Sequence, residues 1–204
     1  MRVSPQTQVA TRERILDVSR KLFVASAFDA ATTRQIAQKA GIAVGTLFNY
    51  FPSKEAIVMD LVREALAESE PADRTQTATS LTFEEDLFAY LAAGMRRLKP
   101  LRLQLPVVLE TTLSPLANGS DGAADGFRTN HLEEVARLAK RHGIDEIPVV
   151  GWNLYWSLYT GFLAFWAHDN SPRQEDTLAL LDESVRMFTA WIEARSLKTE
   201  LKEN

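Results

Sequence analysis

Hydrophobic residues recur along this chain every three or four positions, which is the spacing of one face of an α-helix. Glycine and proline are sparse and runs of β-branched residues are short, so strands are not expected. The first predicted helix covers residues 11–27, with Ile15, Val18, Leu22 and Phe23 on one face. The pattern predicts an all-α protein.

Two short helices are expected to follow this first long one. In the stretch TTRQIAQKA, Thr32 and Gln35 have the spacing of a capping box, which predicts a helix start. Gly41 should end that helix, and a second short one is expected over residues 44–51, where Pro52 stops it. Ser53 can cap the next helix.

The remainder of the chain divides into further helices and two polar connections. The stretch PADRTQTATS is a predicted connector, and Thr82 with Glu85 forms a second capping box. We expect a break or kink at Pro106, a flexible loop at ANGSDGAADG, and a helix over 133–141. Two long helices, over 149–168 and 174–196, should close the chain. These features predict an N-terminal domain over residues 1–60 and a larger helical domain over 61–204.

The two short helices, joined by a turn with glycine after a longer helix, are typical of a helix-turn-helix. In that motif the second short helix enters the major groove of DNA. Leu47 and Phe51 can anchor this helix to the apolar residues of the first two helices, and Gly45 would let the backbone approach DNA closely. The outward positions are then Val44, Thr46, Asn49 and Tyr50.

The run TTRQIAQKAGIAVGTLFNYFPSKEAI resembles the DNA-binding signature of the TetR family of bacterial regulators, over roughly residues 11–60. This resemblance implies a homodimer that binds double-stranded operator DNA. It also implies a small-molecule effector that binds the C-terminal domain and releases the protein from DNA. Repression is the usual output of the family.

The same resemblance assigns roles to individual residues. Thr33, Tyr50 and Lys54 would contact phosphates, because each carries a hydroxyl or an ammonium group. Arg34 would reach a phosphate or a guanine edge, and Asn49 an adenine, while Val44 or Thr46 could touch a thymine methyl. Phe48 stands where the family usually has tyrosine, so we expect fewer backbone contacts and a shallower dependence on salt.

Charge and composition agree with this division. The net charge is −4, but residues 1–60 hold eight Lys/Arg against five Asp/Glu, whereas residues 61–204 are acidic. A basic N-terminal part on an acidic body is expected where only one part meets a polyanion. The chain has no cysteine and its N-terminus has no apolar run, which favours a protein that stays in the reducing cytoplasm.

The segment over residues 147–167 carries no charge and is long enough to span a membrane. Its polar side chains and acidic flanks favour a helix buried within protein instead. Small residues at Ser157, Gly161 and Ala164 would let a second helix approach closely. With an apolar stripe on the last helix they predict a homodimer interface, although both helices could instead fold into a monomeric core. That stripe comprises Leu178, Leu181, Val185, Phe188 and Ile192.

Aromatic and apolar residues of the C-terminal domain could line a pocket for a flat or elongated, mostly apolar molecule. For any one of them, packing in the core is the competing interpretation. The candidates are Phe88, Leu91, Met95, Leu105, Leu109, Trp152, Tyr155, Trp156 and Tyr159.

Other chemistry finds little support in the sequence. His131, His142 and His168 share no metal-ligand spacing and are expected at the surface, so neither a metal nor another cofactor is expected. Catalytic motifs are missing as well. We therefore expect a DNA-binding regulator and not an enzyme. The alternatives are a ligand-binding or sequestering protein that no longer docks on DNA and, more remotely, an enzyme that uses the aromatic pocket.

Overall fold

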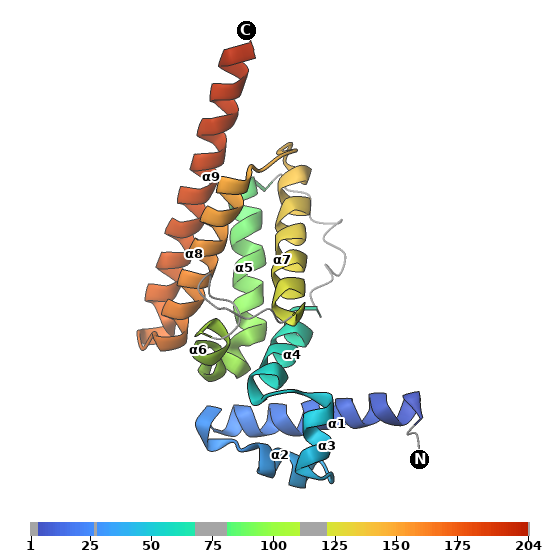
Figure 1. Cartoon of the computed structure of the whole chain (residues 1–204). Helices are drawn as coiled ribbons and strands as arrows, with labels where there is room; N and C mark the ends of the chain where they lie inside the picture. Colours follow the sequence, from blue (N-terminus) through green and yellow to red (C-terminus); the bar gives the residue numbers. More distant parts are fainter. Residues whose placement is uncertain (1–3, 27, 68–80, 111–121, 204) are drawn as a thin grey trace.

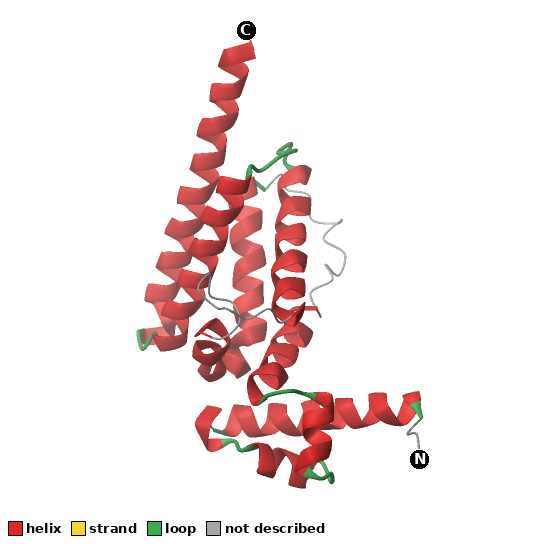
Figure 2. Ribbon diagram, viewed as in Figure 1, coloured by secondary structure: helices red, strands yellow, loops and turns green. Residues whose placement is uncertain are grey.

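The computed structural model describes residues 4–26, 28–67, 81–110 and 122–203, and within these ranges its regular elements are all helices (Figures 1 and 2). The all-α expectation is confirmed. The α-helices are α1 Pro5–Ala25, α2 Thr33–Lys39, α3 Val44–Tyr50, α4 Lys54–Ala67, α5 Phe83–Leu98, α6 Leu105–Val108, α7 Gly122–Arg141, α8 Val149–His168 and α9 Glu175–Glu203. Short 3-10 helices lie at η1 Phe28–Ala30, η3 Lys99–Gln104 and η5 Pro172–Gln174.

Local sequence signals set the ends of the N-terminal helices. Ser4 caps α1, which begins at Pro5, earlier than the expected residue 11. Thr32 and Gln35 form the expected capping box at the start of α2. After α2, Gly41 has a φ of +67°, and the Ile42 amide donates to the Ala37 carbonyl at 3.0 Å. This is the left-handed turn that glycine favours, and it separates α2 from α3.

Helix α4 links the N-terminal domain to the C-terminal bundle. Figure 1 shows α1, α2 and α3 at one end of the molecule, with α5, α7, α8 and α9 standing as a bundle beyond α4. Ser53 caps α4 through the Ala56 amide at 3.1 Å, as expected. Six consecutive residues, from Ile57 to Val62, are buried, because both domains pack against this helix. The expected boundary at residue 60 therefore falls inside a continuous helix.

A second connection joins the domains through η3. The side-chain amide of Gln104, which is fully buried, donates to the backbone carbonyls of Phe23 at 2.8 Å and Ser26 at 3.1 Å. From the same 3-10 helix, Arg102 donates to the backbone carbonyls of Trp166, at 2.7 Å, and Asp169. The segment therefore ties the C-terminal end of α1 to the C-terminal end of α8. Pro106 lies in the first turn of α6, where the chain was expected to kink or restart.

Helix α8 spans 149–168 as expected, and it packs against α9. At Gly151, an added Cβ would lie 2.8 Å from Trp191 of α9 and 2.9 Å from Ile147. Helices α8 and α9 therefore approach each other closely at this glycine. Helix α7 begins at Gly122, not at residue 133, so part of the expected loop at ANGSDGAADG is helical. Its alanines favour a helix over a loop. The rest of that loop and the connector over 71–80 lie outside the described residues.

Candidate nucleic-acid interface and ligand cavity

Helix α3 presents one face to solvent and buries the other. Leu47 and the following Phe51 are only 1% and 2% exposed, and both join the core with Ile15 and Ile36. On the other side, Val44, Gly45, Phe48 and Asn49 are exposed, while Thr46 and Tyr50 are half-buried. The structure therefore places all six residues predicted for α3 on or beside one accessible surface.

The two predicted contacts from α2 lie at its N-terminus. Arg34 is exposed and Thr33 is half-buried, both in the first turn. Backbone amides in a first helical turn have no partner within their own helix, so they can donate to a phosphate. The α2 residues can thus add backbone contacts to those of α3.

Lys54 has partners that the sequence did not indicate. Its ammonium donates to the backbone carbonyls of Phe28 at 2.7 Å and Ala31 at 3.0 Å, and it lies 3.8 Å from the centre of the Phe28 ring. The predicted phosphate contact would have to compete with these interactions. In this structure, Lys54 holds the turn between α1 and α2 in place.

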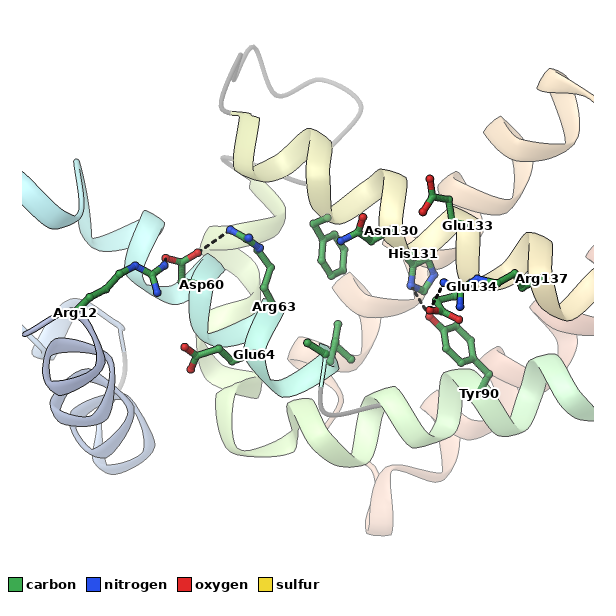
Figure 3. A pocket seen from close by; sticks show the side chains of 13 residues that line it. Arg12, Asp60, Arg63, Glu64, Tyr90, Asn130, His131, Glu133, Glu134 and Arg137 are labelled. Atoms are coloured by element: carbon green, nitrogen blue, oxygen red, sulfur yellow. Dashed lines mark hydrogen bonds and ion pairs between the residues drawn. The ribbon is translucent and has the colours of Figure 1, made fainter. Parts of the chain in front are cut away.

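A cavity of about 500 Å³ opens where α1, α4, α5 and α7 come together (Figure 3). Figure 3 shows Arg12, Asp60 and Arg63 on one side of this space, and His131, Glu134 and Tyr90 on the other. The volume lies within the range of small-molecule sites. Its lining comprises Arg12, Asp60, Arg63, Glu64, Leu66, Ala67, Tyr90, Phe127, Asn130, His131, Glu133, Glu134 and Arg137.

Charged side chains at this cavity are arranged in pairs. Asp60 accepts from Arg12 of α1 and, at 2.8 Å, from Arg63 of its own helix. Glu64 pairs with Arg20 of α1 at 2.7 Å. On α7, Arg137 pairs with Glu134. Two ion pairs therefore cross from α1 to α4 beside the cavity.

His131 occupies the inner wall of the cavity, although the sequence placed it at the surface. That expectation is wrong, because the side chain is buried among aromatic rings and lies 4.2 Å from Tyr159, centre to centre. Its Nε2 atom is hydrogen-bonded to the Tyr155 hydroxyl at 2.8 Å and its Nδ1 atom to the Tyr90 hydroxyl at 3.2 Å. Burial lowers the pKa of His131 to about 3, so the ring is neutral at pH 7.

Tyr90 is held in its neutral form as well. Burial, and then the charge of Glu134, raise the pKa of its hydroxyl to about 12. Burial also raises the pKa of Tyr155 and of Tyr159. The aromatic rings of the cavity are therefore uncharged, and the charges on their side are those of Glu133 and of the Glu134–Arg137 pair.

None of the nine predicted pocket residues lines this cavity. Phe88 and Trp152 are half-buried. The other seven are buried in the core of the C-terminal domain: Leu91, Met95, Leu105, Leu109, Tyr155, Trp156 and Tyr159. Leu91, Met95 and Tyr159 border a much smaller space of about 20 Å³ behind it. The sequence carried one usable signal for the missed residues: Phe127, His131 and Val135 recur at a spacing of four along α7, which marks a buried face.

The residues predicted for a dimer interface fall on two different faces. Ser157, Gly161 and Ala164 are exposed along α8, and Leu178 is exposed on α9. Leu181, Val185, Phe188 and Ile192 instead pack into the core of their own chain, so they are not available to a second chain. Among the described side chains of α8 and α9, the large apolar ones that are exposed are Val149, Val150, Phe165, Leu178 and Met187. The stripe of α9 was assigned to the wrong face, since periodicity alone does not say which neighbour a face meets.

Within the described residues, no helix is long and apolar enough to cross a membrane. Across the same ranges, no group of three or more His, Cys, Asp or Glu side chains is arranged to hold a metal ion.

Comparison with known proteins identifies the N-terminal domain. Residues 15–61 match the family model described as bacterial regulatory proteins, tetR family. The transcriptional repressor KstR of Rhodococcus jostii is 41% identical over 63 residues, and the match covers 30% of this chain and 30% of the relative. KstR of Mycobacterium tuberculosis is 35% identical over 80 residues, covering 39% and 36% of the two chains. These matches thus span about a third of the length of the curated relatives.

Solved structures extend the similarity of the fold to most of the chain. FadR of Thermus thermophilus, a TetR-family repressor solved in complex with lauroyl-CoA, superposes with a TM-score of 0.68 at 23% identity. The aligned part covers 87% of this chain and 93% of that one. A TetR regulator from Rhodococcus sp. RHA1 superposes with a TM-score of 0.66 at 16% identity, covering 91% and 98%.

The helix-turn-helix, the curated repressors that match it and the fold shared over most of the chain agree with one another. Residues 15–61 are thus a DNA-binding domain of the type found in the tetR family of bacterial regulatory proteins, and the rest of the chain has the fold of solved TetR regulators.

Proposed function

We propose that this protein is a one-component transcriptional repressor that binds operator DNA as a homodimer and leaves it when a small molecule binds its C-terminal domain. The observation that carries the proposal is the exposed face of α3, where Val44, Phe48 and Asn49 stand clear of a well-packed domain. Such a rigid helix fits the major groove, and its side chains suit base edges.

The chemistry of this face divides between positioning and reading. The Asn49 amide can pair with adenine through two hydrogen bonds, and Val44 and Phe48 offer apolar contacts to thymine methyl groups. Thr33, Arg34, Thr46 and Tyr50 supply hydroxyl and guanidinium donors for phosphates. Gly45 has no atom within 4 Å of the place where a Cβ would lie, so α3 is open at this point. These features support sequence-specific binding to double-stranded DNA.

A homodimer follows from the need to occupy two major grooves on one side of the duplex, roughly 34–36 Å apart. The exposed small residues Ser157, Gly161 and Ala164 of α8 support a close contact with a second copy. Leu178, Phe165 and Met187 add apolar area on the same pair of helices. We place the dimer contact on these exposed residues, and not on the buried stripe of α9.

The effector site is proposed at the cavity between α1, α4, α5 and α7, since this cavity borders both domains. FadR of Thermus thermophilus was solved with lauroyl-CoA, and FadR of Bacillus subtilis with stearoyl-CoA. Both of those ligands join an apolar chain to an anionic group. We propose an effector of mixed character here too, with no catalytic turnover and no cofactor. A DNA-binding role also places the protein in the cytoplasm.

The test is binding of the purified chain to the DNA upstream of its own gene, measured at several salt concentrations. Affinity that falls steeply as salt rises is the expected result, because phosphate contacts release counterions. If neither this DNA nor any sequence selected from a random pool binds the ligand-free dimer, the repressor proposal fails. The protein would then be a ligand-binding or sequestering protein.

A further inference from the structure

We propose that the cavity binds an amphipathic anion, a molecule with one carboxylate or phosphate group on an apolar body, and that this group competes with Asp60 for Arg12 and Arg63. The inference rests on the proposed function, because it names the class of effector and the way in which binding reaches DNA.

The first argument is the balance of charge around Asp60. A single carboxylate faces two guanidinium groups, since Arg12 donates to its Oδ2 atom and Arg63 donates to its Oδ1 atom. The Asp60 side chain is only 12% exposed, whereas those of Arg12 and Arg63 are 43% and 47% exposed. One positive charge is thus in excess at this end of the cavity, and it remains accessible. Guanidinium groups bind carboxylates and phosphates with two parallel hydrogen bonds.

The neighbouring charges direct an anion to this end. Glu64 is already paired with Arg20, so it does not offset the excess charge. The other acidic residues of the cavity, Glu133 and Glu134, belong to α7 on the far side in Figure 3. Glu134 is paired with Arg137, and Glu133 adds a negative charge that repels an anion from that side.

The second argument is the opposite wall, which suits an apolar body. Phe127, Leu66 and the rings of Tyr90 and His131 line it, and His131 and Tyr90 are neutral at pH 7. The cation on this side of the cavity, Arg137, is already paired with Glu134. A ligand therefore gains most by laying its apolar part against them and its charge against the arginines.

The third argument is the contact between Arg12 and the end of α3. Its guanidinium carbon lies 5.2 Å from the centre of the Phe51 ring, and Phe51 is the residue that ends α3. Arg12 thus contacts both the cavity and the end of the helix proposed to read DNA. An anion that captures Arg12 removes one of the two α1–α4 ion pairs and disturbs the support of α3. Such a ligand binds the state in which the Arg12–Asp60 ion pair is broken more tightly than the state in which it is formed. A difference of this kind is required for a ligand to change the affinity for DNA.

The experiment is calorimetric titration of the full chain with three probes: sodium decanoate, decyl phosphate and the uncharged 1-decanol. We expect both anions to bind about tenfold or more tightly than the alcohol, the size of effect that one charged hydrogen-bonded contact supplies. A preference between decanoate and decyl phosphate distinguishes a carboxylate from a phosphate effector. If no anion binds, or if decanol binds equally well, the inference is overturned.

Variants test the competition directly. Asp60→Asn removes the competing charge and keeps the shape of the side chain. Decanoate should therefore bind several-fold more tightly, which corresponds to about 1 kcal/mol of binding free energy. Arg63→Gln should weaken decanoate about tenfold or more, and Arg141→Gln, an exposed change at the end of α7, should leave it unaltered. Weaker or unchanged binding by Asp60→Asn, in a variant with wild-type urea unfolding, would contradict the competition.

Operator binding separates this inference from the proposed function. Saturating decanoate should lower the operator affinity of the wild-type chain, and Arg63→Gln should blunt that response. If the chain binds an operator but no anion, the repressor proposal stands and the inference fails. If it binds anions in the predicted order but no DNA, the cavity assignment stands and the repressor proposal fails.

Discussion

The ammonium group of Lys54 donates to the carbonyl of Phe28 at 2.7 Å and lies 3.8 Å from the centre of the same residue's ring. A further hydrogen bond, to Ala31 at 3.0 Å, closes the turn that leads into α2. The residue that sequence resemblance assigns to a DNA phosphate thus joins the start of α4 to the turn before α2. Lys54 positions the helix-turn-helix from inside the domain.

Lys54→Met should therefore lower the stability of the N-terminal domain. Hydrogen bonds from a charged donor contribute roughly 1.5–3 kcal/mol each, and the partial exposure of Lys54 places the loss near the low end. Urea unfolding measures it. The dependence of DNA binding on salt should stay nearly unchanged. A loss of about one unit in the salt slope, with unchanged stability, would instead support the phosphate contact.

Asn49→Ala should reduce affinity for the operator by about 1–3 kcal/mol and leave binding to unrelated DNA almost intact. The reason is that Asn49 is exposed on α3 and is proposed to read a base, whereas non-specific affinity comes from phosphates. Fluorescence anisotropy with both DNAs measures the two affinities. Asn170→Ala, an exposed asparagine beyond α8, is the matched control. Equal losses on both DNAs would exclude base reading by Asn49.

Gly161→Leu should convert the proposed dimer to a monomer without unfolding the chain. No described atom of the chain lies within 4 Å of the position that a Cβ would take at Gly161, so the chain itself leaves room there, and the added side chain would obstruct a second copy packed on this face. Sedimentation or light scattering gives the mass. A variant that remains a dimer at the same concentration would remove this face from the proposed interface.

Gly151→Ala provides the contrast on the same helix. Its Cβ would lie 2.8 Å from the ring of Trp191 and 2.9 Å from Ile147, which is too close for either neighbour. Overpacking of this kind costs about 1–3 kcal/mol. We expect a lower unfolding midpoint in urea and an unchanged dimer mass for this variant, the reverse of the result at Gly161.

The burial of His131 predicts loss of stability in mild acid. The pKa of the ring is lowered from an ordinary 6.5 to about 3. Between these two values the ring is protonated in the unfolded chain and neutral in the folded chain. The contribution of the neutral ring to the free energy of unfolding is fully present above pH 6.5 and is lost as the pH drops from 6.5 toward 3. Between pH 7.5 and pH 5 the loss should be about 2 kcal/mol from this group.

Urea unfolding at the two pH values measures this effect. His131→Gln keeps hydrogen-bonding capacity but does not titrate, so it should show a pH dependence smaller by about 2 kcal/mol. If the two proteins lose the same stability between pH 7.5 and pH 5, the ring of His131 is protonated in the folded chain. The assignment of a neutral wall to the cavity would then be wrong.

Features that depend on neighbours in sequence were predictable from the sequence. The capping boxes at Thr32 and Thr82, the turn at Gly41 and the bounds of α8 each rest on residues only a few positions apart. The exposed face of α3 also followed, because Leu47 and Phe51 supply apolar anchors at helical spacing, and both are buried. Resemblance to a family then added DNA as the expected partner of that face, which spacing alone does not name.

The sequence by itself thus determined the helical class, the capped starts of α2 and α5, the bounds of α8 and the outward side chains of α3, because these follow from local hydrogen bonding and periodicity. Only the tertiary structure decided the partners of Lys54, the burial of His131, the face of α9 that meets the core, and the cavity bounded by Arg12 and Asp60. Each of these depends on which distant segments pack together. An amphipathic pattern shows that a face is buried, but the shape of the assembled helices determines what it is buried against.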